Sequence, residues 1–188
     1  MKKNNLRLRR FGDPVLRQQA SLLGKDEILS DDIQRLIQDI RELNATKQYG
    51  VGLAAPQVGV SIALSVIGIK PTPTRPDVQP FERVIINPSY EGIGHRTGMW
   101  EGCQSGGRGS DTLYAKALRY RRIRAKWLDE DAMEHEEELD GFVAHVFQHE
   151  TDHVNGVLFV DRVRDTRTYM MADEFRRRIV AKKPRKTH

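Results

Sequence analysis

The chain carries the pattern H-E-x-x-H from His149 to His153. On an α-helix of about 3.6 residues per turn, two residues four positions apart lie about 40° apart around the axis and roughly 6 Å apart along it. Two imidazoles placed this way can hold one divalent metal ion, and Glu150 beside them can act as a general base. The alternative is a pair of surface histidines on a polar helix stripe. The pattern favours a catalytic metal site.

The residues around this pattern predict the helix that it needs. Asp140 is placed to cap the start of the helix, and Gly156 is placed to end it in a left-handed conformation. Apolar residues between them recur at helical spacing and supply a face to bury. These residues are Phe142, Val143, Val146 and Phe147.

A catalytic metal site of this kind needs a third protein ligand. His145 shares the helix stripe, but it would stand about 12 Å from His153 along the axis, so we expect it to be a neighbouring or exposed histidine. Cys103, the chain's only cysteine, is the other candidate. A cysteine nucleophile with a histidine base would leave Glu150 unused, and a free cysteine can also be a small core residue. The spacing favours a ligand.

Two further segments extend the pattern around the metal site, GVGLAAPQ at residues 50–57 and EGCQS at 101–105, followed by QHETDH at 148–153. In this order and at similar separations they match the motifs G-x-G-L-A-A-x-Q, E-G-C-x-S and Q-H-E-x-D-H. The chain resembles the peptide deformylases, metallohydrolases that remove the formyl group from the initiator methionine of nascent chains. The resemblance runs from about residue 7 to about residue 163.

The resemblance implies that Cys103, His149 and His153 hold one divalent metal ion. Ferrous iron is the ion typical of the family, and zinc, nickel or cobalt can occupy such a site. Glu150 would take the proton of the metal-bound water, whose hydroxide attacks the formyl carbon, and pass it to the leaving amine.

Other motif residues receive roles toward the substrate by the same resemblance. The side-chain N–H of Gln57 and the backbone N–H of Gln104 would stabilise the developing oxyanion. Backbone groups of Val51, Gly52 and Leu53 would pair with the main chain of an N-formylmethionyl nascent peptide. Two apolar residues of the metal-binding helix, Val146 and Phe142, would line the methionine pocket.

The segment after Cys103 departs from the family. Gln104 stands where leucine is usual, and the glycine-rich segment 104–119 lacks the proline that normally follows this motif. We expect a more mobile wall of the peptide groove and an altered substrate preference, with a neutral variation as the alternative.

Two other classes of protein could contain part of this pattern. A zincin-type endopeptidase shares H-E-x-x-H, but residues 50–57 and Cys103 have no place in it. A deformylase-like protein that binds formyl peptides or the ribosome without efficient turnover would not need Glu150 and Gln57. The sequence therefore favours an active deformylase.

The remaining sequence predicts an α+β fold, with antiparallel strands packed around the central metal-binding helix, an N-terminal helix and a C-terminal helix. Ser30 is the expected N-cap of a helix that ends at Gly50. An ordered loop follows at 50–59, and the acidic segment 129–138 is expected to connect a hairpin. Strands are predicted at 62–69, at 83–88 with a closing turn, and from Tyr120 through Ile123, Ala125 and Trp127; the C-terminal helix is predicted around 169–180.

Charge and composition indicate the partners and the cellular location of the protein. The chain has 31 Lys and Arg against 26 Asp and Glu, and its surplus lies after Glu174, in Arg176–Arg178 and the tail beyond. Such a tail can dock on ribosomal RNA, or it can be a solvated terminus. We expect a catalytic domain at 1–165, a C-terminal helix and basic tail at 166–188, a cytoplasmic location, and neither a membrane nor DNA as partner.

Overall fold

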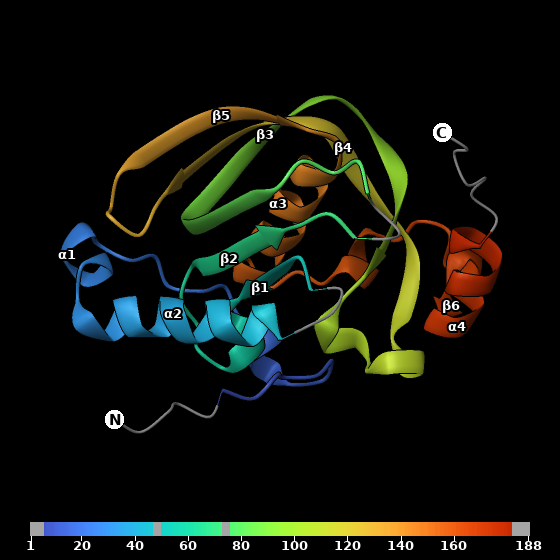
Figure 1. Cartoon of the computed structure of the whole chain (residues 1–188), viewed down its shortest axis with the longest axis horizontal. Helices are drawn as coiled ribbons and strands as arrows, with labels where there is room; N and C mark the ends of the chain where they lie inside the picture. The colour runs from blue at the N-terminus through green and yellow to red at the C-terminus, as the bar shows by residue number, and fades with distance from the viewer. Residues whose placement is uncertain (1–5, 47–49, 73–75, 182–188) are drawn as a thin grey trace.

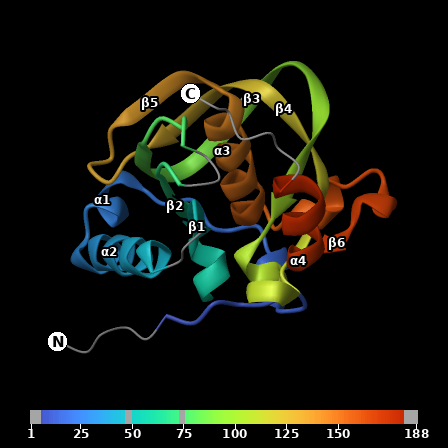
Figure 2. The same ribbon diagram turned by 45° about the vertical axis from the view of Figure 1, so that its right-hand side comes forward.

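A computed structural model describes residues 6–46, 50–72 and 76–181. One antiparallel sheet curves around helix α3 (Gly141–Val154), which lies at its centre, and helix α2 (Asp31–Ala45) lies beside the strands Gly52–Ala54 and Leu64–Ile69 at one end of the sheet (Figure 1, Figure 2). This is the predicted α+β arrangement. The strands pair in the order β1 (Gly52–Ala54), β2 (Leu64–Ile69), β3 (Phe81–Gly102), β4 (Leu113–Leu128) and β5 (Glu134–Asp140), while β6 (Met170–Met171) pairs with β4.

Apolar side chains fill both faces of the sheet. Ile37 and Ile40 of α2 pack with Leu53 and Val66 on one face, and all four are buried. A second cluster joins α3 to the other face and includes Ile67, Ile85, Val146 and Phe147. The sheet therefore holds α3, the expected metal-binding helix, between its curved strands.

Helix α2 begins as predicted but ends earlier. The Ser30 hydroxyl accepts a hydrogen bond from the backbone N–H of Ile33 and caps the helix. The helix ends at Ala45 rather than at Gly50, because Leu43 is the last residue of its apolar face. A short helix, α1 (Lys25–Ile28), precedes it.

The segment 50–59 is not simply a loop. Gly52–Ala54 form β1, which pairs with β2, and Ala55–Val58 form a 3-10 turn. A strand of three residues has too short a pattern to be recognised locally, and the pairing with residues 65–67 creates it.

The strand predicted at 83–88 does not close in a turn. It continues as β3 to Gly102, with a register shift between Ile86 and Ser89 and a positive φ of 51° at Asn87. The irregularity is a bulge that accommodates Pro88, which has no N–H to donate to the ladder.

The acidic segment 129–138 is only partly a connection. Its second half belongs to β5, because the carboxylates lie opposite cations of β4 and form cross-strand pairs. Glu138 lies 2.9 Å from Arg122, and Glu136 lies 3.2 Å from Lys126. The strand predicted from Tyr120 is confirmed, although β4 begins earlier, at Leu113.

The ends of α3 agree with the sequence. Asp140 occupies the N-cap position, although its side chain makes no capping hydrogen bond, and Gly156 adopts a φ of +69° just after the helix. The predicted C-terminal helix is divided: β6 is followed by α4 (Ala172–Phe175) and a π-helical turn, Arg176–Val180.

The C-terminal segment contacts the sheet. Phe175 stacks on Tyr114 of β4 with the ring centres 4.2 Å apart. The basic residues Lys182, Lys183, Arg185 and Lys186 lie outside the described residues. The division at residue 165 stays a prediction. Within the described part of the chain, no helix has both the length and the apolar character needed to cross a membrane.

Candidate metal and catalytic site

The end of β3 and helix α3 bring Cys103, His149 and His153 together. One ligand atom of each lies within 4.8 Å of the others. The sulfur of Cys103 is 3.3 Å from Nε2 of His153. The four-residue spacing of the histidines thus acts as the sequence predicts, and the cysteine, 46 positions before His149, meets them through the fold.

The chemistry of these three residues fits a divalent metal ion. His153 is 1% exposed, and its Nδ1 has no hydrogen-bond partner among the described residues. Burial, together with the charge of His149, holds the pKa of His153 well below its usual range, so the imidazole is in the neutral form that binds metals. One thiolate and two imidazoles leave room for a fourth, non-protein ligand.

Glu101 contacts two histidines of α3, His145 and His149, a role that the sequence alone did not predict. Its carboxylate contacts Nδ1 of His149 and lies 2.6 Å from Nε2 of His145. A hydrogen bond to one ring nitrogen orients the other toward a ligand position. His145 is therefore a neighbouring histidine as expected, but it is buried rather than exposed.

A buried arginine completes this arrangement. Arg119, 1% exposed, donates to both carboxylate oxygens of Glu101, at 2.9 and 2.7 Å, and also to Asp152. Although burial alone would raise the pKa of Glu101, the charges of His149 and Arg119 and the histidine hydrogen bonds hold it well below its usual range. Glu101 is thus a stable carboxylate. The only sequence signal was its place in the motif EGCQS.

Glu150 lies on the side of α3 that faces β1. It is 2% exposed, and its Oε2 has no hydrogen-bond partner within the described residues. Burial raises the pKa of Glu150 to about 7. The backbone of Gly52 approaches so closely that a Cβ on Gly52 would lie 2.6 Å from the Glu150 carboxyl carbon. Gly52, the second glycine of GVGL, therefore leaves the space that the Glu150 side chain occupies.

Gln57 reaches the same place from the 3-10 turn after β1. Its Oε1 accepts a hydrogen bond from the Ala54 N–H at 2.9 Å, which directs Nε2 toward the metal-binding residues. Nε2 donates to the Ser105 hydroxyl at 3.2 Å and lies 3.5 Å from the Cys103 sulfur. Gln104 begins a 3-10 turn directly after Cys103, at the same place.

The residues expected to bind the substrate have different positions. Gly52 and Leu53 are buried in β1, and Val51 directly precedes them. Val146 and Phe142 belong to α3; Val146 is buried, Phe142 is partly buried, and both pack in the core between α3 and the sheet. Their part in a methionine pocket stays a prediction.

Comparison with known proteins agrees with this geometry. Residues 6–169 match the family model described as polypeptide deformylase. The chain belongs to the polypeptide deformylase family. The peptide deformylase of Leptospira biflexa is 40% identical over 167 residues, which cover 85% of this chain and 88% of that protein. The peptide deformylase of Thermotoga maritima is 37% identical over 167 residues, which cover 88% of this chain and 91% of that protein.

Solved structures of the family share the fold. A class I type b peptide deformylase from Acinetobacter baumannii, bound to Met-Ala-Ser, matches with a TM-score of 0.78 and 28% identity over 86% of this chain and all of that one. The Synechococcus elongatus peptide deformylase in complex with actinonin matches with a TM-score of 0.73 and 33% sequence identity, over 89% of this chain and 84% of that one. The chain is therefore a metal-dependent hydrolase that removes formyl groups from nascent peptides, and the binding protein without turnover is not favoured.

Proposed function

We propose that Cys103, His149 and His153 hold a single ferrous ion and that the surrounding residues deformylate N-formylmethionyl peptides. The main support for this proposal is that one ligand atom of each of the three residues lies within 4.8 Å of the others, beside the buried carboxylate of Glu150. A thiolate and imidazoles suit iron, and zinc, nickel or cobalt can use the same donors. An ion held there supplies a Lewis acid and lowers the pKa of water.

The protein moves the proton through Glu150. Its Oε2, which has no partner among the described residues, accepts the proton of the attacking water and returns it to the nitrogen of methionine. Water adds to the formyl carbon, the carbon–nitrogen bond breaks, and formate and a free amine leave.

Gln57 and Gln104 stabilise the oxyanion in this proposal. The Gln57 carboxamide is fixed by Ala54, so its N–H groups are already oriented before the substrate binds. The backbone N–H of Gln104 acts beside it. The peptide main chain lies along Val51, Gly52 and Leu53 in this proposal. A peptide substrate class is supported by the related Acinetobacter protein, whose structure contains bound Met-Ala-Ser.

Removal of the metal tests this function directly. Enzyme loaded anaerobically with iron, and a parallel sample loaded with nickel, should release formate from formyl-Met-Ala-Ser. A chelator should abolish release, and reloading should restore it, because the water is no longer activated without an ion. A protein with one bound metal per chain and no formate release would contradict the proposal and restore the alternative of a binding protein.

The close approach of Gly52 to the Glu150 side chain gives a second prediction. Gly52→Ala should lower kcat/KM by about 10²-fold, because the new methyl group displaces Glu150 and a misplacement of about 1 Å can have this effect. Steady-state kinetics check it, with Gly98→Ala as control, since a Cβ at Gly98 meets its nearest neighbour at an ordinary 3.5 Å. A Gly52→Ala enzyme with wild-type kinetics would remove Glu150 from the proposed position.

We also propose that the basic C-terminal segment docks on the ribosome, in the cytoplasm. The π-helical turn Arg176–Val180 presents exposed arginines, of which Arg177 and Arg178 pair with Glu174. Deleting residues 174–188 should abolish co-sedimentation with ribosomes, and the binding of the full chain should weaken steeply with salt. Unchanged co-sedimentation after the deletion would contradict docking without affecting the proposed chemistry.

A further inference from the structure

Arg10, near the start of the chain, contacts the turn that follows Cys103. Its Nη1 donates a hydrogen bond to the carbonyl oxygen of Gln104 at 3.1 Å, across 94 positions of sequence. The Arg10 side chain is partly buried, and a guanidinium stays charged in proteins. A positive charge is thus fixed on the backbone beside a proposed metal ligand, and the proposed chemistry does not use it.

The peptide group that Arg10 contacts also donates to the sulfur of Cys103. The N–H of Ser105 belongs to the same peptide group as the Gln104 carbonyl, and its nitrogen lies 3.4 Å from Sγ. Carbonyl and N–H point in opposite directions in a trans peptide, so Arg10 and the sulfur lie on opposite sides of this group. The three groups form one chain of hydrogen bonds, from the guanidinium through the peptide to the sulfur.

A hydrogen bond to the carbonyl oxygen strengthens the N–H donor at the other end of a peptide group. Hydrogen bonds in a chain polarise one another, and a charged donor has the larger effect. Arg10 therefore makes the Ser105 N–H a better donor to the Cys103 thiolate. A thiolate that accepts a stronger hydrogen bond gives less electron density to a bound metal ion, so the ion stays a stronger Lewis acid.

The charge of Arg10 also lies close enough to the thiolate to act on it through space. Burial, followed by the charge of Arg108, lowers the pKa of Arg10 from its usual value, and the charge of Cys103 acts in the opposite direction. The guanidinium and the sulfur therefore attract each other directly, in addition to the contact through the peptide group.

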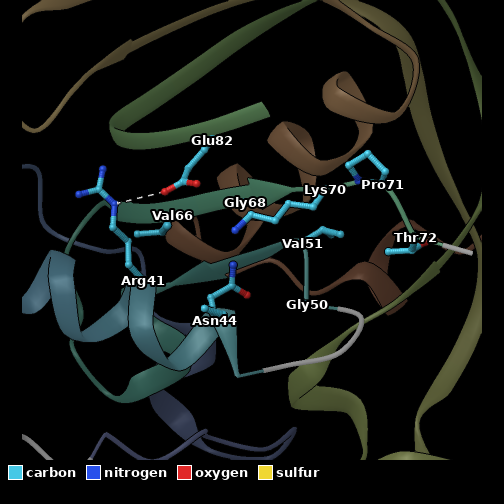
Figure 3. Close-up of a pocket in the computed structure, with 11 residues that line it drawn as sticks. Arg41, Asn44, Gly50, Val51, Val66, Gly68, Lys70, Pro71, Thr72 and Glu82 are labelled. Carbon is cyan, nitrogen blue, oxygen red and sulfur yellow. Dashed lines mark ion pairs between the residues drawn. The ribbon is translucent and has the colours of Figure 1, made fainter. Parts of the chain in front are cut away.

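Arg10 lies away from the cavity beside β1. That cavity, of about 300 Å³, borders Gly50 and Val51 and lies between α2 and β2, and Arg10 is not among the described residues that line it (Figure 3). Arg10 and Ser105 line a second cavity, of about 410 Å³. A peptide that follows β1 does not need to reach Arg10, so we expect Arg10 to act through the turn and not by binding substrate.

We propose that Arg10 is a positioning residue of the metal site. Its guanidinium holds the peptide group between Gln104 and Ser105 and strengthens the hydrogen bond that this group donates to the Cys103 thiolate. The inference rests on the proposed function, because it assumes a metal ion on Cys103.

Absorption of the cobalt-substituted enzyme tests this role, because the energy of the thiolate-to-cobalt charge-transfer band follows the electron density at the sulfur. Arg10→Met keeps most of the side-chain length without charge or donor, and it should move the band to lower energy. Arg10→Lys keeps a charged donor, so its band should lie closer to that of the wild-type enzyme. Arg7→Ala removes the same charge from an exposed position of the same segment and should leave the band in place.

Kinetics and stability separate this role from a purely structural one. With formyl-Met-Ala-Ser, Arg10→Met should lower kcat about three- to tenfold, the range expected for one hydrogen bond, and leave KM nearly unchanged. Backbone bonds hold the segment without the Arg10 side chain, since the Arg9 N–H donates to the Gln57 carbonyl at 2.7 Å and the Phe11 N–H to the Ser105 carbonyl at 3.1 Å. Metal content and Tm should therefore stay near the wild-type values.

Three results would overturn the inference. They are an unchanged cobalt band in Arg10→Met, an equal shift in Arg10→Lys and Arg10→Met, and loss of bound cobalt from Arg10→Met, which would make the side chain a structural support of the site. Failure of the proposed function would differ, since the metal-loaded wild-type enzyme would then release no formate, whereas the comparison of bands needs no turnover.

Discussion

Glu150→Gln is expected to lower kcat by about 10³-fold while one metal ion per chain remains bound, within the range typical of a lost general base. The amide has nearly the shape of the carboxylate but cannot accept a proton. Glu150 lies outside the group formed by Cys103, His149 and His153, so the donors are untouched. Formate release and metal analysis of the same sample measure the two halves of the prediction.

The comparison with a ligand variant makes this result specific. His149→Ala should lose activity together with metal, because a donor atom is removed, whereas Glu150→Gln should lose activity alone. Retention of turnover within tenfold by Glu150→Gln would mean that another group moves the proton. Loss of metal from Glu150→Gln would instead assign Glu150 to metal binding.

Glu101→Gln should reduce both stability and metal affinity. The carboxylate lies between His145, His149 and Arg119, and it is 5% exposed. Removing one member of a buried charge network leaves its partner uncompensated, at a cost of about 3–5 kcal/mol. For a chain of this size that corresponds to a fall in Tm of about 10 °C.

Metal affinity should fall by about 10- to 100-fold in the same variant, because His149 loses the hydrogen bond that orients it. Thermal unfolding and competition with a chelator measure the two effects. Glu138→Gln is the matched control, since Glu138 forms an exposed pair with Arg122 that is worth about 0–1 kcal/mol. Equal effects in both variants would show that the buried network contributes no more than a surface pair.

The sequence determined the parts of this protein that depend on short spacing. Two histidines four residues apart on a helix with Asp140 and Gly156 at its ends must share one face, whatever surrounds them. Ser30 capped α2 as predicted, and the alternation of Ile123, Ala125 and Trp127 marked β4. The resemblance of three motifs then related Cys103 to the helix, which spacing alone left open.

The tertiary structure decided what depends on contacts between distant residues. β1 is a strand because β2 pairs with it, and residues 134–138 join β5 because cations of β4 lie opposite. Arg119 is buried because Glu101 and Asp152 surround it. No local pattern encodes such partners, since each contact is favourable only when the whole chain brings both sides together and desolvates them. The bond from Arg10 to the carbonyl of Gln104, separated by 94 positions, is of the same kind.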